Sequence, residues 1–65
     1  MNNDVVYSNG AFDVFAYITT VSGKSITAYG IRRTDRPQDG MIFACPNKDY
    51  SIHVADGYKE TLTKG

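Results

Sequence analysis

A two-residue turn joins two long runs of β-branched and aromatic residues, and this arrangement constrains the fold more than any other feature of the chain. The runs are Ala11–Val21 and Lys24–Arg33, with Ser22-Gly23 between them. Such a pattern is a strong local signal for a β-hairpin. A helix is a poor competitor, because β-branched residues are frequent and Gly23 and Gly30 interrupt the segment. We therefore predict a hairpin in which Val21 pairs with Lys24.

The predicted register sorts the side chains of this hairpin onto two faces, because successive residues of a strand point to opposite sides. One face is apolar and is the predicted core face; its cross-strand pairs are Phe12 with Arg33, Val14 with Ile31, Ala16 with Tyr29 and Ile18 with Thr27. The other we call the aromatic–basic face; its pairs are Asp13 with Arg32, Phe15 with Gly30, Tyr17 with Ala28 and Thr19 with Ile26. The aromatic–basic face therefore requires either a packing partner or a binding role.

A shorter β-prone run precedes this hairpin and a polar loop follows it. Asp4–Tyr7 ends at Ser8-Asn9-Gly10, where the Asn-Gly pair suits a type I′ turn, so the chain is predicted to open with another hairpin. Thr34–Gly40 has no apolar residue and contains a proline, a glycine and alternating charges. It is the longest predicted loop, of the kind that often carries function.

The remaining residues are predicted to form two further strands and a short tail. Met41–Cys45 is a continuous apolar run, which is typical of a strand buried on both faces, and Pro46 ends it. Within this run Phe43 is assigned to the core, together with Val14, Ile18 and Ile31. Tyr50–Val54 alternates and is predicted as a fifth strand. The tail, residues 58–65, is too short for a stable isolated helix, and an edge strand, one helical turn and a frayed end remain as alternatives.

These elements predict a mainly β protein, a single small domain over residues 1–65 built as an antiparallel meander of four to five strands with a short C-terminal tail. No amphipathic helix of adequate length is predicted to cover the core face. The sheet must then curl into a small barrel or be completed by dimerisation. A chain this short buries little surface, and its single cysteine, Cys45, permits no internal disulfide. We therefore expect a homodimer.

The charge balance argues against a strong nucleic-acid binder. Seven Lys and Arg residues balance seven Asp and Glu residues, and the pI is near 6.5.

No apolar stretch approaches the length of a membrane span, and the first residues lack the features of an export signal. With a lone thiol as well, we expect a cytoplasmic protein that does not contact the membrane.

Aromatic and basic side chains gather on one face of the hairpin and in the loop after it. The candidate binding residues are Phe15, Tyr17, Lys24, Arg32, Arg33 and Arg36. Aromatic rings beside cations are what single-stranded nucleic-acid binders use, because bases stack on the rings and phosphates pair with the cations. The alternative is structural: Phe15 would cover Gly30, Arg32 would pair across the strands, and Tyr17 would lie in an interface.

No pattern of residues indicates catalysis, a metal site or a cofactor. His53 is predicted to point away from the core, and no spacing places a nucleophile and an acidic residue beside it. Cys45 is predicted to be a small buried hydrophobic residue, and with the single histidine it cannot complete a zinc site. The aspartates Asp35, Asp39 and Asp49 lack the spacing of a calcium loop. We expect a protein that is not an enzyme and binds no metal.

Three segments resemble the SpoVG septation-regulator family. They are Asp13-Val14-Phe15-Ala16-Tyr17-Ile18-Thr19, Ile31-Arg32-Arg33 and Gly40-Met41-Ile42-Phe43-Ala44-Cys45-Pro46-Asn47-Lys48, which lie within a stretch of about half of the chain. The resemblance implies a β-sheet that dimerises and a cytoplasmic regulator that binds nucleic acid. The tail is not predicted to form the C-terminal helix to which the family's DNA-binding residues are assigned. No functional residue of the family is therefore carried over to this chain.

The expected function is that of a non-enzymatic binding protein, a regulator or inhibitor. It would dock a face of the β-sheet, or the Arg33–Gly40 loop, on a protein partner, because a small neutral chain without catalytic motifs acts most readily by occupancy. The alternative is a SpoVG-like nucleic-acid-binding regulator that uses the aromatic–basic face. An accessory protein of a phage or mobile element, from another lineage, also fits the sequence.

Overall fold

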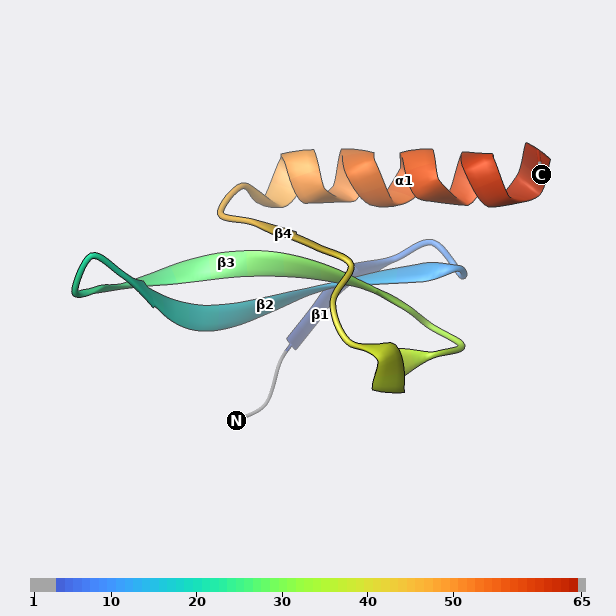
Figure 1. The fold of residues 1–65 in the computed structure, drawn as a ribbon. Helices are drawn as coiled ribbons and strands as arrows, with labels where there is room; N and C mark the ends of the chain where they lie inside the picture. Colours follow the sequence, from blue (N-terminus) through green and yellow to red (C-terminus); the bar gives the residue numbers. More distant parts are fainter. Residues whose placement is uncertain (1–3, 65) are drawn as a thin grey trace.

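A computed structural model describes residues 4–64 of the chain and shows one antiparallel sheet with a helix packed on it (Figure 1). The strands follow one another in the order β1-β2-β3-β4. The elements are β1 (Asp4–Ser8), β2 (Phe12–Val21), β3 (Lys24–Arg33), the short 3₁₀ helix η1 (Pro37–Asp39), β4 (Phe43–Cys45) and α1 (Lys48–Lys64). The predicted four-stranded antiparallel meander and the mainly β class are confirmed.

The central hairpin has the predicted register along its whole length. Val21 pairs with Lys24, and the pairing continues without interruption to Phe12 and Arg33. Ser22 and Gly23 both have positive φ, 52° and 80°, which is the geometry of a type I′ turn. The right-handed twist of this turn matches the twist of the strands, so the turn fixes the register and with it the two faces.

The opening hairpin forms as predicted, but its turn is of another kind. Gly10 has a φ of 91°, whereas Asn9 does not have the positive φ that a type I′ turn requires. Instead the side-chain carbonyl of Asn9 accepts hydrogen bonds from the backbone N–H groups of Ala11 and Phe12, at 3.0 and 2.9 Å. The asparagine therefore folds the turn through its side chain.

A helix replaces the predicted fifth strand. The segment Tyr50–Val54 lies inside α1, which continues through the tail to Lys64. Asn47 caps the helix: its side-chain carbonyl accepts a hydrogen bond from the N–H of Tyr50 at 2.8 Å. The helix forms because the residues that pack on the sheet have helical spacing: they are Ser51, Ala55 and Tyr58. Ser51 and Ala55 are fully buried.

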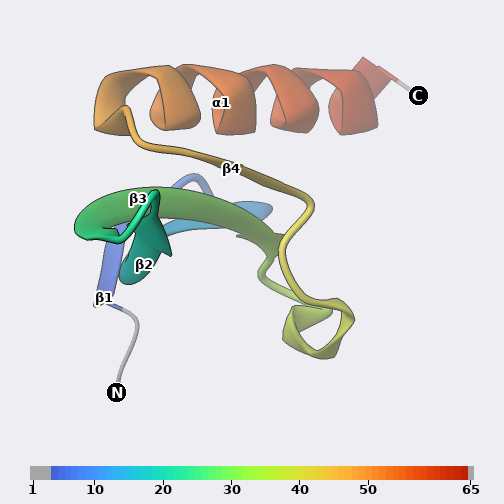
Figure 2. The same cartoon turned by 60° about the vertical axis from the view of Figure 1, so that its left-hand side comes forward.

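This helix covers the core face of the sheet, so the sheet neither curls into a barrel nor exposes its core (Figure 2). The fully or nearly fully buried centre consists of Phe12, Val14, Ile31 and Ala55. Phe43 is half-buried and packs against this cluster. Val14 and Ile31 are confirmed as core residues.

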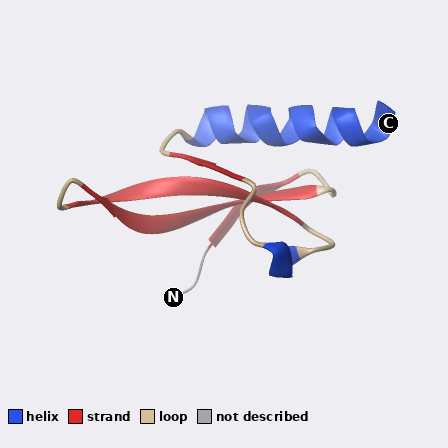
Figure 3. Cartoon of the chain, viewed as in Figure 1, coloured by secondary structure: helices blue, strands red, loops and turns tan. Residues whose placement is uncertain are grey.

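The core is shorter than the hairpin, and one predicted core residue lies outside it. Ile18 is 69% exposed, because α1 begins near Cys45 and Tyr29 and extends toward the Phe12 end of the sheet. The Ser22-Gly23 end of the hairpin therefore projects beyond the helix (Figure 3). The assignment of Ile18 to the core is wrong for this reason.

The apolar run Met41–Cys45 is also less buried than predicted. Only Phe43–Cys45 forms a strand, and it lies at the edge of the sheet beside Tyr29–Ile31. Met41 and Ile42 precede it and are each 47% exposed. Because only three residues of this run form a strand, and that strand lies at the edge of the sheet, the run is not buried on both faces.

A polar cluster joins the helix to the turn between β1 and β2. The Tyr7 hydroxyl donates to an Asp56 carboxylate oxygen at 2.7 Å, and the Asn9 amide donates to the same oxygen at 3.1 Å. Lys59 donates to the backbone carbonyl of Asn9 at 2.7 Å. The hydroxyl and the amide lower the pKa of Asp56, and the carboxylate in turn raises the pKa of Tyr7. We call this cluster the helix clamp.

Alanine substitution of two isoleucines on the same predicted face tests how far the core extends along the hairpin. Ile31→Ala should lower the free energy of unfolding by about 2–5 kcal/mol, because the side chain is fully buried. Ile18→Ala should change it by less than about 0.5 kcal/mol, because the side chain is mostly in solvent. Urea denaturation followed by circular dichroism measures both values. Equal losses for the two variants would contradict the helix position described above.

The helix clamp makes stability depend on pH in a defined direction. Asp56 has a lowered pKa in the folded state, so its contribution is present above the unfolded value near about 3.9 and is lost as the pH falls through the folded value. Asp56→Asn should therefore flatten the fall in the thermal midpoint between about pH 5 and pH 3. Glu60→Gln, which removes a carboxylate from the same helix outside the clamp, is the control and should retain the wild-type slope.

Candidate functional site

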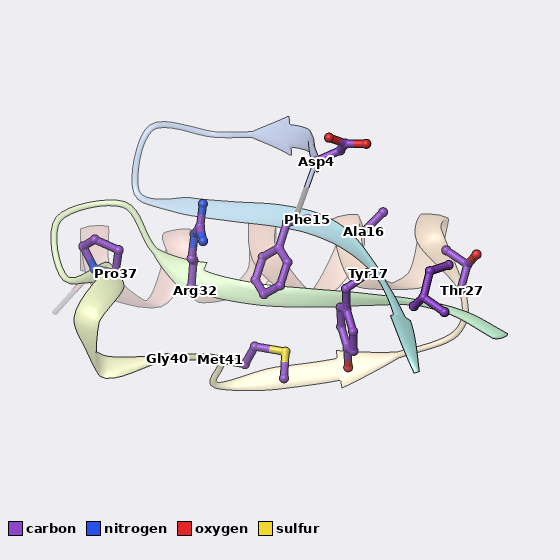
Figure 4. A pocket seen from close by; sticks show the side chains of 10 residues that line it. Asp4, Phe15, Ala16, Tyr17, Thr27, Arg32, Pro37, Gly40 and Met41 are labelled. Carbon is purple, nitrogen blue, oxygen red and sulfur yellow. The ribbon is translucent and has the colours of Figure 1, made fainter. Parts of the chain in front are cut away.

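The face of the sheet opposite α1 contains a half-open pocket of about 900 Å³ (Figure 4). Strands β2 and β3 form its floor, and the loop between β3 and β4 passes along one side (Figure 2). The residues that line it are Asp4, Phe15, Ala16, Tyr17, Ile18, Thr27, Arg32, Pro37, Gly40 and Met41. Phe15, Tyr17 and Arg32 come from the aromatic–basic face, and Pro37, Gly40 and Met41 come from the loop. Ala16, Ile18 and Thr27 belong to the predicted core face and also line the pocket, and Ile18 is largely exposed there.

The aromatic residues of the pocket come from alternate positions of β2. Phe15 and Tyr17 lie on the same side of the strand, and their ring centroids are 5.8 Å apart with the planes tilted by 38°. Phe15 is only 4% exposed, whereas Tyr17 is half-buried. Phe15 therefore belongs to the floor of the pocket, and Tyr17 is the ring that a ligand would reach first.

Arg32 lies above the Phe15 ring, with its guanidinium carbon 4.9 Å from the ring centroid. The predicted cross-strand pair with Asp13 is present, but the Arg32 Nε to Asp13 Oδ2 distance is 3.9 Å, which is an ion pair without a hydrogen bond. The Nε atom is buried and has no hydrogen-bond partner. Because a guanidinium has N–H donors in a fixed fork, Arg32 is suited to receive an acceptor from outside the chain.

Glycine at position 30 is required by the close approach of two side chains. A Cβ on Gly30 would lie 2.8 Å from the Phe15 ring and would also overlap the Met41 side chain. Phe15 thus covers the glycine, as the structural alternative predicted. Met41, Pro37 and Gly40, by contrast, were not among the predicted site residues. Their only signal was their position at the end of the polar loop, next to an apolar run.

The other predicted binding residues do not join this pocket. Arg33 lies on the opposite face of β3 and donates to both carboxylate oxygens of Asp35, at 3.0 and 3.1 Å, which lowers the pKa of that carboxyl. Arg36 pairs with Asp39 at 2.8 Å. Lys24 is exposed at the end of the hairpin, roughly 26 Å along β3 from Arg32 at about 3.3 Å per residue. The basic cluster of the sequence is therefore dispersed in space.

The two residues considered for catalysis lie on the helix side of the sheet. His53 is exposed on α1. Cys45 is half-buried, and its sulfur lies 3.0 Å from the Ser51 hydroxyl and 3.3 Å from the Asn47 carbonyl. Within the residues that the structure describes, no group of three His, Cys, Asp or Glu side chains is placed to hold a metal ion. In that same part of the chain, α1 is neither long enough nor apolar enough to cross a membrane.

Comparisons with known protein families, with curated proteins and with solved structures found no match to this chain. The resemblance to the SpoVG family therefore stays a prediction from three sequence segments. The functional argument depends on the pocket itself.

Two glycine-to-alanine substitutions test the packing of the pocket floor. Gly30→Ala should destabilise the protein by about 1–3 kcal/mol, because the added methyl group displaces Phe15 and Met41. Gly57→Ala, in the exposed middle of α1 where no heavy atom lies within 4 Å, should stabilise it by about 1 kcal/mol. Thermal and urea unfolding of the two variants would give opposite signs. A neutral Gly30→Ala would mean that Met41 does not close over the floor.

Proposed function

We propose that this chain is a small non-enzymatic binding protein that acts by docking its aromatic–basic face on a protein partner, as a regulator or inhibitor. The observation that carries the proposal is the half-open pocket, in which an aromatic floor and a thioether surround the Arg32 guanidinium, whose buried Nε lacks a hydrogen-bond partner. Largely apolar pockets with a few oriented polar groups are the usual form of binding sites. A partner that fits this pocket would present a bulky apolar side chain beside a carbonyl or carboxylate group.

The pocket supports docking through the sheet face more strongly than docking through the Arg33–Gly40 loop. Both arginines of this segment, Arg33 and Arg36, are already paired with aspartates of the same loop. A new partner would have to compete with these internal pairs. The half-buried Tyr17 ring and the exposed Met41 side chain, in contrast, form no ion pair with the loop and offer apolar area directly.

Nucleic-acid binding is the second candidate, and one observation favours it. Arg32 and the half-buried ring of Tyr17 lie on the same face, which suits a phosphate beside a stacked base. The distribution of charge counts against it, because Arg33 and Arg36 are paired and Asp4 also lines the pocket. A continuous basic track is the usual footprint of a nucleic-acid interface. A cytoplasmic location, expected from the lone thiol of Cys45, fits either candidate.

Matched variants on the two faces test the proposal. The full chain, immobilised through its N-terminus, should retain a partner from extracts of its source cells that Tyr50→Ala retains and that Tyr17→Ala and Met41→Ala lose. Tyr50 is an exposed aromatic residue on α1 and controls for unspecific adhesion. Fluorescence polarisation with the identified partner should show a loss of about 1–3 kcal/mol for Tyr17→Ala, in the range of interface hot spots. Equal retention by all variants would reject docking through this face.

Oligonucleotide titrations at two salt concentrations decide between the candidates. If nucleic acid is the ligand, Arg32→Ala should reduce the salt slope by about one unit, because one phosphate contact is lost. Arg33→Ala should leave the slope nearly unchanged, because this side chain is paired with Asp35 on the other face. Fluorescence anisotropy with single- and double-stranded oligonucleotides measures both. We expect no binding at low salt, and specific binding with this pattern would replace the protein-docking proposal.

A further inference from the structure

The central hairpin extends beyond both of its neighbours in the sheet. Strand β1 pairs with β2 only as far as Ala16, and β4 pairs with β3 only as far as Tyr29. The remaining part, Tyr17–Val21 with Lys24–Ala28, is a two-stranded ribbon that projects from the body of the protein (Figure 1). We call it the hairpin arm. Its two long edges have no strand beside them within the described residues.

The two edges of the hairpin arm differ in how far they are protected. The β2 edge, Tyr17–Val21, contains no charged residue and no proline, and Val21 is 51% exposed. The β3 edge carries Lys24, and the connection from β4 to α1 leaves the sheet beside it (Figures 1 and 2). Charged residues and covering segments are the devices that protect edge strands from pairing. Within the part of the chain that the structure describes, the β2 edge has neither a charged residue nor a covering segment.

We propose that a second copy of this chain pairs antiparallel with the free β2 edge, about a twofold axis at Thr19. The pairing would join Ile18 to Thr20 of the second copy, Tyr17 to Val21 of the second copy, and Thr19 to its own equivalent. An antiparallel strand is complementary to itself, so this contact closes as a dimer. Docking on the aromatic–basic face also uses Tyr17, so variants at other positions separate the two proposals: Met41→Ala tests docking, and Thr20→Pro tests the dimer.

The hydrogen-bond pattern selects this register. Val21 and Lys24 flank the two-residue turn and form a hydrogen-bonded pair, and such pairs alternate along the ladder. The backbone N–H and C=O groups of Ile18 and Thr20 consequently point away from β3 toward the free edge. A register centred on Thr19 uses all of these groups, in about four hydrogen bonds between the copies.

Side chains and lengths agree with the same register. On the aromatic–basic face Tyr17 would lie opposite Val21 of the second copy, and an aromatic residue beside a β-branched one is a favourable cross-strand pair. Within the described residues β1 pairs with β2 no further than Ala16, which leaves Tyr17–Val21 for the second copy. Its Lys24 would lie two strands from Tyr17, at about 10 Å. The second copy thus adds to the pocket edge the one predicted binding residue that is remote in the monomer.

Cysteine cross-linking tests the axis directly. Thr19→Cys, in a Cys45→Ala background, should form a disulfide-linked dimer under mild oxidation, because paired strands bring equivalent positions within disulfide range. Ile26→Cys is the matched control: Ile26 is the cross-strand neighbour of Thr19, equally half-buried, but on the β3 edge. We expect cross-linking of Thr19→Cys to be at least roughly tenfold faster. Equal rates, or faster cross-linking at Ile26, would overturn the proposal.

Proline substitutions test the hydrogen bonds. Thr20→Pro removes an N–H that points to the free β2 edge, and Ser25→Pro removes the corresponding group on the β3 edge. Light scattering at tens of micromolar, roughly the range suited to weak interfaces, should show dimers for the wild type and for Ser25→Pro and monomers for Thr20→Pro. Circular dichroism verifies that each variant is folded. A monomeric wild type, or a dimer that survives Thr20→Pro, would overturn the proposal, and the cross-linking result decides alone if a proline variant does not fold.

Discussion

The packing of α1 on the core face of the sheet is the contact on which the other features of this molecule depend. The helix contributes Ala55 and Ser51, which are small and fully buried, and Ala55 packs in one buried cluster with Val14 and Ile31. Small residues at a helix–sheet contact allow close approach, which lets a short chain fill its core densely. The helix clamp at Asp56 holds the middle of the same helix against the turn at Asn9. One face of the sheet is thereby covered within the monomer.

Because the helix covers only one side, the polar chemistry of the opposite face stays available. A buried donor without a partner costs about 1–3 kcal/mol, whereas a cation over an aromatic ring contributes about 0.5–2 kcal/mol. The contact of Arg32 with Phe15 therefore offsets its unpaired Nε only in part. A surface in which every polar group is paired would have a hydrogen-bond acceptor beside the Arg32 Nε. Local features that a fold leaves unsatisfied are the places where binding is expected.

The sequence predicts those parts of the fold that depend on local geometry. The Ser22-Gly23 turn fixes the register, and the register alone predicts the contacts of Arg32 with Asp13 and of Phe15 with Gly30. The helix was missed because Tyr50–Val54 also alternates over a short span, and because its stabilising stripe, Ser51 and Ala55, consists of residues that are not strongly apolar. The cap at Asn47, directly after Pro46, was the available signal. Arg33 and Arg36 were assigned to the site from proximity in sequence, which says nothing about the opposite faces of a strand or about pairing within a loop.

The length of the helix relative to the hairpin connects docking to self-association. Since α1 covers the sheet from Tyr29 and Cys45 to Phe12, the turn end of the hairpin arm is left outside the core, with Ile18 in solvent. Antiparallel pairing of two arms about an axis perpendicular to the sheet places both helices on one side and both pockets on the other. A dimer of this kind would present two docking faces in the same direction, with Lys24 of each copy beside the pocket of the other. Two linked sites raise the apparent affinity for a repetitive or dimeric partner well above that of either site, so weak docking by a single small pocket would be sufficient for regulation.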